Sequence, residues 1–186
     1  MRLRPATRDD AAAIAAIYAP YVTASAVSFE TDEPGAAEMR LRIVAGEGRY
    51  PWLVAVDAAE GIVGYAYATG FRARPAYRFC VETSVYLDSA AQGQGVGGLL
   101  CRALIATLEA QRFAQAIAAI TLPNDASVRL HERLGFTVAG VYRQVGYKQG
   151  EWHDVGLWQR ALAAPADPPA EPLLLAELSQ SFPPGA

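Results

Sequence analysis

Cysteine and histidine are scarce in this sequence. Its 186 residues include only Cys80, Cys101, His131 and His153 of these two types. Two dispersed cysteines are too few for a disulfide framework, and the two histidines do not complete a zinc-type spacing. We therefore expect two buried thiols and no metal site.

Long apolar runs and basic tracts are also missing. No apolar stretch approaches the ~18 residues that a membrane span needs, and the N-terminus, MRLRPATRDD, has no apolar signal segment. The formal net charge is −3, without a basic tract of the kind that binds nucleic acid. These features favour a cytoplasmic protein with neither a membrane nor a nucleic-acid partner. With 52% hydrophobic residues, the chain can bury one substantial core.

The apolar spacing predicts strands and helices in a mixed α/β layer fold. Strands are expected at 3–5, 52–56, 62–69, 79–87 and 117–122, helices at about 7–18, 38–45, 96–108 and 124–134, and a last hairpin at 137–159. Six of the 12 prolines follow residue 162. This composition predicts one domain, 1–162, and a mobile Pro-rich C-terminal tail, 163–186, outside it; the alternative is that its apolar LLLAEL segment docks as a short helix.

A glycine-rich turn, QGQGVGG, lies between a strand pattern and a helix pattern. The alternating strand ends near Leu87, and helical spacing of apolar residues starts at Val96. Glycine lets the backbone approach an anion closely, and the unpaired N–H groups of a helix start attract negative charge. The turn is therefore expected to hold a diphosphate through Gln92, Gly93, Gln94, Gly95, Val96, Gly97 and Gly98.

Three nucleotide-binding signatures compete for this turn. A P-loop requires Lys and then Ser or Thr after its last glycine, but leucine follows Gly98. A dinucleotide fold leads its strand directly into the first glycine, whereas Asp88 to Gln92 intervene here. Gln92-x-x-Gly95-x-Gly97 instead resembles the Q/R-x-x-G-x-G/A signature of the GNAT acetyltransferase superfamily. The resemblance implies acetyl-CoA as co-substrate, with its pyrophosphate in the turn and its pantetheine along Val85, Tyr86 and Leu87.

A second signature follows the strand at 117–122. The residues that stand where the superfamily has N-x-x-A-x-x-x-Y-x-x-x-G-F are Asn124, Ser127, His131, Gly135 and Phe136. The tyrosine of that pattern usually protonates the departing CoA thiolate, and this chain has His131 in its place. An imidazole with a pKa near ~6.5 can donate to a thiolate whose acid has a pKa near ~8.5; the alternative is a half-exposed surface histidine. Asn124, Ser127 and the nearby Arg133 are the expected contacts to CoA.

Several longer blocks narrow the resemblance. VETSVYL, TLPNDASVRLHERLGF, RYPWLVA and GYKQGEWHDVGLWQ resemble phosphinothricin N-acetyltransferases and the relatives that acetylate methionine sulfoximine and methionine sulfone. The match spans about 2–162. It implies a GNAT-type mixed, mainly antiparallel twisted sheet flanked by helices, with Glu82 as general base and His131 as its catalytic partner. It also implies a homodimer, for which Trp152, Leu157 and Trp158 offer apolar surface.

The chemistry itself requires a base, because an α-amino group with a pKa near ~8 is mostly protonated at pH 7. Glu82, on the strand just before the glycine turn, can accept that proton directly or through one water. A structural or solvent-facing carboxylate is the alternative. Backbone N–H groups at 85–87 are candidates to polarise the thioester oxygen.

The acceptor site is expected to be positively charged. Arg72 and Arg74 precede the same strand, and guanidinium groups bind carboxylate or phosphinate bidentately, so the pair favours a small anionic amino acid. A solvated basic loop is the other interpretation. Phe29 matches an aromatic residue in the family's N-terminal substrate loop, unless it is plain core. The expected substrate-binding residues are Phe29, Arg72, Arg74, Glu82 and Thr83.

Together these patterns predict an N-acetyltransferase that moves acetyl from acetyl-CoA to the amino group of a small anionic amino acid in a ternary complex. Two alternatives stay open. An acetyltransferase for cationic amines or protein N-termini would share the CoA half of the site, but it should place acidic residues where Arg72 and Arg74 stand. A non-catalytic CoA-binding module would keep the glycine turn and lose Glu82 and His131, which are both present.

Overall fold

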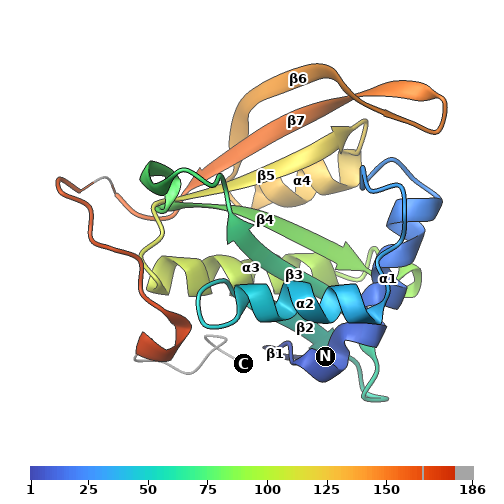
Figure 1. Ribbon diagram of the computed structural model, residues 1–186, viewed down its shortest axis with the longest axis horizontal. Coiled ribbons are helices and arrows are strands. Elements are labelled where there is room, and N and C mark those ends of the chain that lie inside the picture. The colour runs from blue at the N-terminus through green and yellow to red at the C-terminus, as the bar shows by residue number, and fades with distance from the viewer. Residues whose placement is uncertain (165, 179–186) are drawn as a thin grey trace.

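The computed structural model describes residues 1–164 and 166–178, which form one mixed sheet with helices on both of its faces (Figure 1). Within these residues the sheet has seven strands in the order β1-β2-β3-β4-β5-β7-β6. Neighbouring strands are antiparallel except β4 and β5, which are parallel. The strands are β1 (Arg2–Pro5), β2 (Trp52–Val56), β3 (Ile62–Gly70), β4 (Cys80–Leu87), β5 (Gln115–Leu122), β6 (Thr137–Lys148) and β7 (Glu151–Ala161). This is the predicted fold class.

Two helices cover each face of the sheet (Figure 1). They are α1 (Ala11–Thr23) and α2 (Ala36–Gly46) on one face, and α3 (Val96–Ala110) and α4 (Asp125–Arg133) on the other. Each face has its own core. Val81 of β4 packs with Leu104 and Leu108 of α3, whereas Tyr86 of β4 packs with the cluster that contains α1 and α2. Because strand side chains alternate, odd-numbered residues of β4 face α3 and even-numbered ones face α1 and α2.

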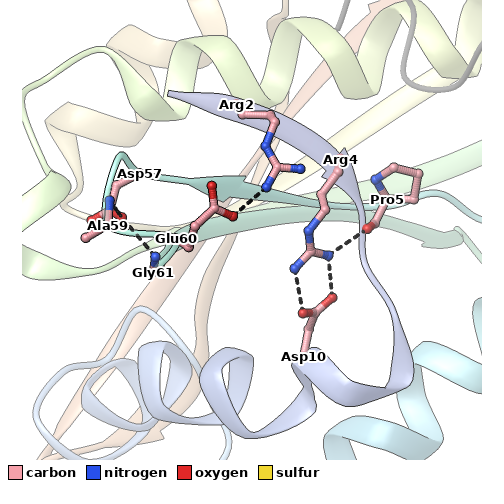
Figure 2. Close-up of polar contacts among 8 residues, drawn as sticks. All are labelled: Arg2, Arg4, Pro5, Asp10, Asp57, Ala59, Glu60 and Gly61. Atoms are coloured by element: carbon pink, nitrogen blue, oxygen red, sulfur yellow. Dashed lines mark hydrogen bonds and ion pairs between the residues drawn. The ribbon is translucent and has the colours of Figure 1, made fainter.

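The start of the chain fixes α1 against the sheet (Figure 2). Both oxygens of the Asp10 carboxylate accept from the Arg4 guanidinium at 2.7 Å, and Asp10 also accepts the Thr7 N–H at 2.7 Å. The hydrogen bonds from Arg4 hold the pKa of Asp10 below its usual range. A more exposed pair, Arg2 and Glu60 at 2.7 Å, ties β1 to the turn between β2 and β3. The Arg4–Asp10 contacts therefore join the start of α1 to β1.

The predicted elements are present, with small shifts at their ends. Helix α1 continues through Pro20 to Thr23, beyond the predicted end at residue 18, and β5 begins at Gln115. The last hairpin turns at Gln149 and Gly150, which both have left-handed φ values, 54° and 84°. No α-helix in the described part of the chain is long and apolar enough to cross a membrane. Cys101 is buried as expected, but Cys80 is only partly buried.

Part of the C-terminal tail is not outside the fold. Gln111 and Leu173 exchange two hydrogen bonds, from the Leu173 N–H to the Gln111 carbonyl at 2.8 Å and from Gln111 Nε2 to the Leu173 carbonyl at 2.9 Å. The Leu175 N–H donates to the Gly48 carbonyl at 2.8 Å, and Glu171 forms an ion pair with Arg78 at 2.6 Å. For 171–178 these contacts favour the alternative expectation, in which the LLLAEL segment docks on the domain. LLLAEL docks through extended backbone and one 3₁₀ turn, Leu175–Glu177, while residues 165 and 179–186 lie outside the described residues.

The surface expected for a dimer also needs correction. Trp158 is buried in the core on the α3 face, because β7 is an inner strand and this side chain points inward. Leu157 is partly buried, and only Trp152 of the three expected residues is exposed. The other exposed apolar side chains of this hairpin lie on the edge strand β6, at Val138, Val141, Tyr142, Val145 and Tyr147.

Candidate acetyl-transfer site

The site is built around an edge of β4 that β5 leaves open. Pairing between β4 and β5 ends at Glu82 and Ile117, but pairing between β4 and β3 continues to Leu87. At one end of β4 the Cys80 carbonyl accepts the Phe71 N–H, and just past the other end the Asp88 N–H donates to the Val63 carbonyl. Because hydrogen-bonded pairs recur every second residue in an antiparallel ladder, the even-numbered residues of β4 bond to β3. The backbone N–H and C=O of Val85 and Leu87 therefore point into the gap. Such an edge can bind an amide-bearing chain as a strand would.

Only some of the backbone N–H and C=O groups on this open edge are without a hydrogen-bond partner in the described chain. The Tyr21 hydroxyl donates to the Leu87 carbonyl at 2.7 Å and accepts the Leu87 N–H at 3.2 Å. It also accepts from Gln92 Nε2 at 3.2 Å. Of the three backbone positions expected to meet CoA, Tyr86 bonds to β3 and Leu87 bonds to Tyr21, so Val85 is the one whose N–H and C=O remain for a ligand.

The glycine turn has the geometry of an anion cradle. Gly93 and Gly95 have left-handed φ values of 73° and 81°, which other residues adopt only with strain. The first i→i−4 hydrogen bond of α3 runs from Leu99 to Gly95, so the N–H groups of Val96, Gly97 and Gly98 have no partner within the helix. The Arg102 guanidinium lies over Gly98, 3.3 Å from where a Cβ would stand. These donors fit the diphosphate of acetyl-CoA.

A cavity of about 50 Å³ passes through the gap beside the open edge. It is bounded by residues from both faces of β4, together with the far end of β5, the start of α4 and the loop after α1. Its lining residues are Val27, Thr83, Ser84, Val85, Tyr86, Ala118, Ala119, Ile120, Thr121, Asn124, Ser127 and His131. The cavity is therefore bounded by residues from both faces of the sheet at the open edge of β4.

Glu82 lies on the α1 and α2 side of this gap. It is half-buried, and burial raises the pKa of its carboxyl, while the nearby Arg72 guanidinium opposes the rise. Among the described residues, no side-chain hydrogen bond or ion pair occupies its carboxylate. A carboxylate with a raised pKa and free oxygens is suited to accept a proton.

His131 lies on the opposite side, toward α3 and α4. It is 5% exposed and packs edge-on against Phe136 with ring centroids 5.2 Å apart, so it is not the surface histidine of the alternative interpretation. Its Nδ1 is 2.8 Å from the Ser127 carbonyl, which can only accept, so Nδ1 carries a hydrogen. Burial lowers the pKa of His131, and the neutral ring then has an unprotonated Nε2. It can protonate a thiolate only after Nε2 has itself gained a proton.

The other expected site residues near His131 differ in their position relative to the cavity. Asn124 and Ser127 both line the cavity, and Asn124 Oδ1 caps α4 by accepting the Ser127 N–H at 3.1 Å. Arg133 is exposed in the last turn of α4, and no hydrogen bond or ion pair links it to another described residue. Thr83 also departs from expectation: it faces α3, and its hydroxyl donates to the Ile117 carbonyl at 3.3 Å, where β5 leaves β4. Its hydroxyl stabilises the mouth of the gap instead of facing the acceptor side with Glu82.

Of the two expected arginines, Arg72 is the one that interacts with groups on the acceptor side. Arg72 lies close enough to Glu82 to act on its pKa, and its Nη2 is 3.4 Å from the Tyr142 hydroxyl of β6. Arg74 is exposed just before a short 3₁₀ turn, and its guanidinium bonds to no residue of the described chain. Both arginines are exposed, so the guanidinium group with a contact on this side is that of Arg72.

Phe29 belongs to a loop that the last hairpin holds in place. Its ring is 39% exposed and lies against Gly146 of β6, where a Cβ would stand 2.1 Å from the ring. Lys148, the only lysine in the sequence, donates to the carbonyls of Val22 and Ser28 at 2.6 Å each. The loop after α1 is thus held just before Phe29 by Lys148 and at the Phe29 ring by the hairpin, and a ring that is 39% exposed is not part of the core.

Comparisons with known proteins identify the family of this chain. Residues 3–157 match the family model described as an acetyltransferase (GNAT) domain. A phosphinothricin N-acetyltransferase of Streptomyces viridochromogenes is 45% identical over 93% of this chain and 94% of its own length. An L-methionine sulfoximine/L-methionine sulfone acetyltransferase of Salmonella typhimurium is 37% identical over 91% of this chain and 99% of its own.

A solved structure shares the whole architecture. It is a GNAT superfamily phosphinothricin acetyltransferase from Sinorhizobium meliloti in complex with AcCoA, with a TM-score of 0.89, 37% identity and coverage of 97% of this chain and 98% of that one. The chain belongs to the GNAT acetyltransferase family.

Three residues of the site had not been expected from the sequence: Tyr21, Tyr142 and Lys148. Each acts through a hydrogen bond to a residue far away in the chain, such as Leu87 for Tyr21 and Arg72 for Tyr142. The lone lysine was the one visible signal, since its isolation in an arginine-rich chain is unusual. The two tyrosines carry no local pattern that distinguishes them from core aromatics.

Proposed function

We propose that this chain transfers acetyl from acetyl-CoA to the α-amino group of a small anionic amino acid of the phosphinothricin, methionine sulfoximine or methionine sulfone type. The observation that carries the proposal is the position of Arg72 beside Glu82, on the acceptor side of the open β4 edge. A guanidinium there binds the anionic group of the substrate while the carboxylate faces its amine. The substrates in the names of the relatives are small anionic amino acids of this kind.

The chain's own groups divide the reaction between the two sides of the sheet. Acetyl-CoA supplies the activated acetyl thioester. The N–H groups of 96–98 bind its diphosphate, and the Val85 N–H and C=O align the pantetheine and thioester that enter the gap. Glu82 removes a proton from the substrate ammonium, which makes the amine nucleophilic. As the amine nitrogen bonds to the acetyl carbon, it loses a second proton, which the neutral His131 can accept at Nε2 directly or through water. His131 can then give that proton to the sulfur that leaves as the C–S bond breaks, while Nδ1 stays bonded to Ser127.

We further propose that the enzyme is a homodimer through the exposed side of β6 and works in the cytoplasm, where acetyl-CoA is available. β6 is an edge strand with a row of exposed apolar residues, the kind of surface that proteins usually cover. This contact would place a second copy next to the hairpin that holds Phe29.

An acetyl-transfer panel tests the substrate proposal, with free thiol release as the signal and each amino acid paired with its uncharged amide. We expect the acids to be preferred. Arg72→Ala should raise KM for the acid by about one to two powers of ten, the loss of ~1.5–3 kcal/mol for a hydrogen bond to a charged group. Arg74→Ala is the matched control and should change KM little. Equal kcat/KM for acid and amide in the parent enzyme would instead favour a cationic or peptide acceptor.

A further inference from the structure

Helix α1 carries two tyrosines, one turn apart, that share a packing partner and differ in what their hydroxyls bind. Tyr18 and Tyr21 both pack edge-on against Tyr86 of β4, with ring centroids 4.8 and 5.0 Å away and interplanar angles of 79° and 68°. Tyr86 borders the cavity through the gap. The two rings therefore share one packing partner, although Tyr18 is buried and Tyr21 is partly buried, and their hydroxyl groups lead to different halves of the site.

The Tyr21 hydroxyl reaches the cofactor half. Its bonds to the N–H and C=O of Leu87 replace those of the neighbouring strand that β4 lacks there, and its third bond holds the side chain of Gln92. Leu87 is the last residue of β4, and Gln92 opens the glycine turn. One hydroxyl thus joins the end of the open edge to the start of the anion cradle.

The Tyr18 hydroxyl reaches the acceptor half. It lies 2.6 Å from the hydroxyl of Ser28, which is buried, and donates to Glu30 at 2.9 Å. Arg42 of α2 holds the same Glu30 with two hydrogen bonds of 2.7 and 2.9 Å. Phe29 lies between these two anchored residues, so Tyr18 fixes the part of the loop that presents Phe29.

We propose that Tyr21 and Tyr18 are positioning residues with separate tasks: Tyr21 sets the acetyl-CoA cradle and Tyr18 sets the acceptor loop. This inference rests on the proposed function only for the identity of the acceptor. Tyr→Phe at either position keeps the ring against Tyr86 and removes the hydroxyl alone. In Tyr21→Phe the Leu87 N–H and C=O lose their partner, and Gln92 is released. In Tyr18→Phe the buried Ser28 hydroxyl keeps only the Glu30 N–H as a partner, and Glu30 keeps Arg42 but loses its link to α1.

Each of the two variants is measured in two ways. The Kd of CoA is determined by calorimetry without acceptor, and the KM is determined for the best acceptor in the panel, whatever its charge. Tyr21→Phe should raise the Kd of CoA about threefold to tenfold and leave acceptor KM within about twofold. Tyr18→Phe should do the reverse. A merely structural role would lower the melting temperature of both variants and move both constants together.

Other outcomes are decisive as well. If both variants raise the same constant, or if Tyr21→Phe leaves the Kd of CoA within about twofold, the division of tasks is wrong. Should either tyrosine variant fold poorly, Gln92→Leu and Ser28→Ala remove the partner atoms instead and must show the same crossed pattern. If the best acceptor is an amide or a cationic amine, the proposed substrate class fails, but the crossed pattern is still measured on that acceptor.

Discussion

Glu82 and His131 owe their chemical character to the opposite faces of the sheet on which they lie. Glu82 is in a half-buried position beside Arg72, and His131 is buried against Phe136 with Nδ1 committed to Ser127. Their place in sequence motifs predicted that both would be near the site. The motifs did not predict that the resting histidine would hold its only proton away from Nε2, since this depends on the carbonyl of Ser127 in the turn before it.

The base is tested by Glu82→Gln, which keeps the shape of the side chain and removes its ability to accept a proton. We expect turnover to fall by about 10² or more with the Kd of CoA little changed. Glu60→Gln, an exposed carboxylate on the turn between β2 and β3, is the control and should stay near the parent. Near-parental kcat in Glu82→Gln at pH 7 would assign the carboxylate a structural role.

The pH profile of activity tests whether burial and Arg72 set the pKa of Glu82. Glu82 must be ionised to act as a base, so activity falls as pH decreases through its pKa, and burial places that pKa above the ordinary glutamate value of about 4.3. Arg72 lowers this pKa, so Arg72→Ala should move the acid limb of kcat/KM to higher pH. Arg74→Ala should leave the limb in place. An unmoved limb in Arg72→Ala would show that the two groups do not interact.

At the scale of elements, the sequence predicted where the strands and helices lie far better than which segments pair or dock along their edges. Alternation over 79–87 and the glycines after it located β4 and the start of α3. That β5 leaves β4 after Ile117 depends on pairing between distant segments, which no local pattern encodes. The tail shows the same limit: its proline content predicted mobility, but the buried Gln111 provides hydrogen bonds that hold 171–178 against the domain.

The cradle makes a prediction about one backbone conformation. Gly95 and Gly48 have the same φ of 81°, and neither has a neighbour within 4 Å of an added Cβ, but only Gly95 lies in the anion turn. Alanine at either position should cost a similar backbone strain, of the order of 1 kcal/mol. Acetyl-CoA should raise the melting temperature of Gly48→Ala as it does that of the parent, and much less that of Gly95→Ala. Equal shifts in both variants would remove the cradle assignment.

At the scale of the whole molecule, β6 is the outer strand of the sheet (Figure 1), and the proposed dimer would connect assembly to the acceptor site through it. One side of the hairpin holds Phe29 through Gly146 and Lys148, and its exposed side carries Val138, Val145, Tyr147 and Trp152. Covering that exposed side would also limit movement of the strand that supports the acceptor loop. The sequence indicated this hairpin as apolar, but it could not distinguish Trp152, which faces outward, from Trp158, which faces the core.

The dimer is therefore tested together with the acceptor site. We expect the parent to be a dimer by light scattering, and Tyr147→Glu, at a side chain that is 62% exposed, to shift it toward monomer. The control is Leu41→Glu on α2, which is 63% exposed on another part of the surface and should stay dimeric. Because β6 supports Phe29, the monomeric variant should lose acceptor affinity while its Kd for CoA stays near the parental value. A parent that is monomeric at micromolar concentration would contradict the β6 interface, and the hairpin would then hold the acceptor loop within a single chain.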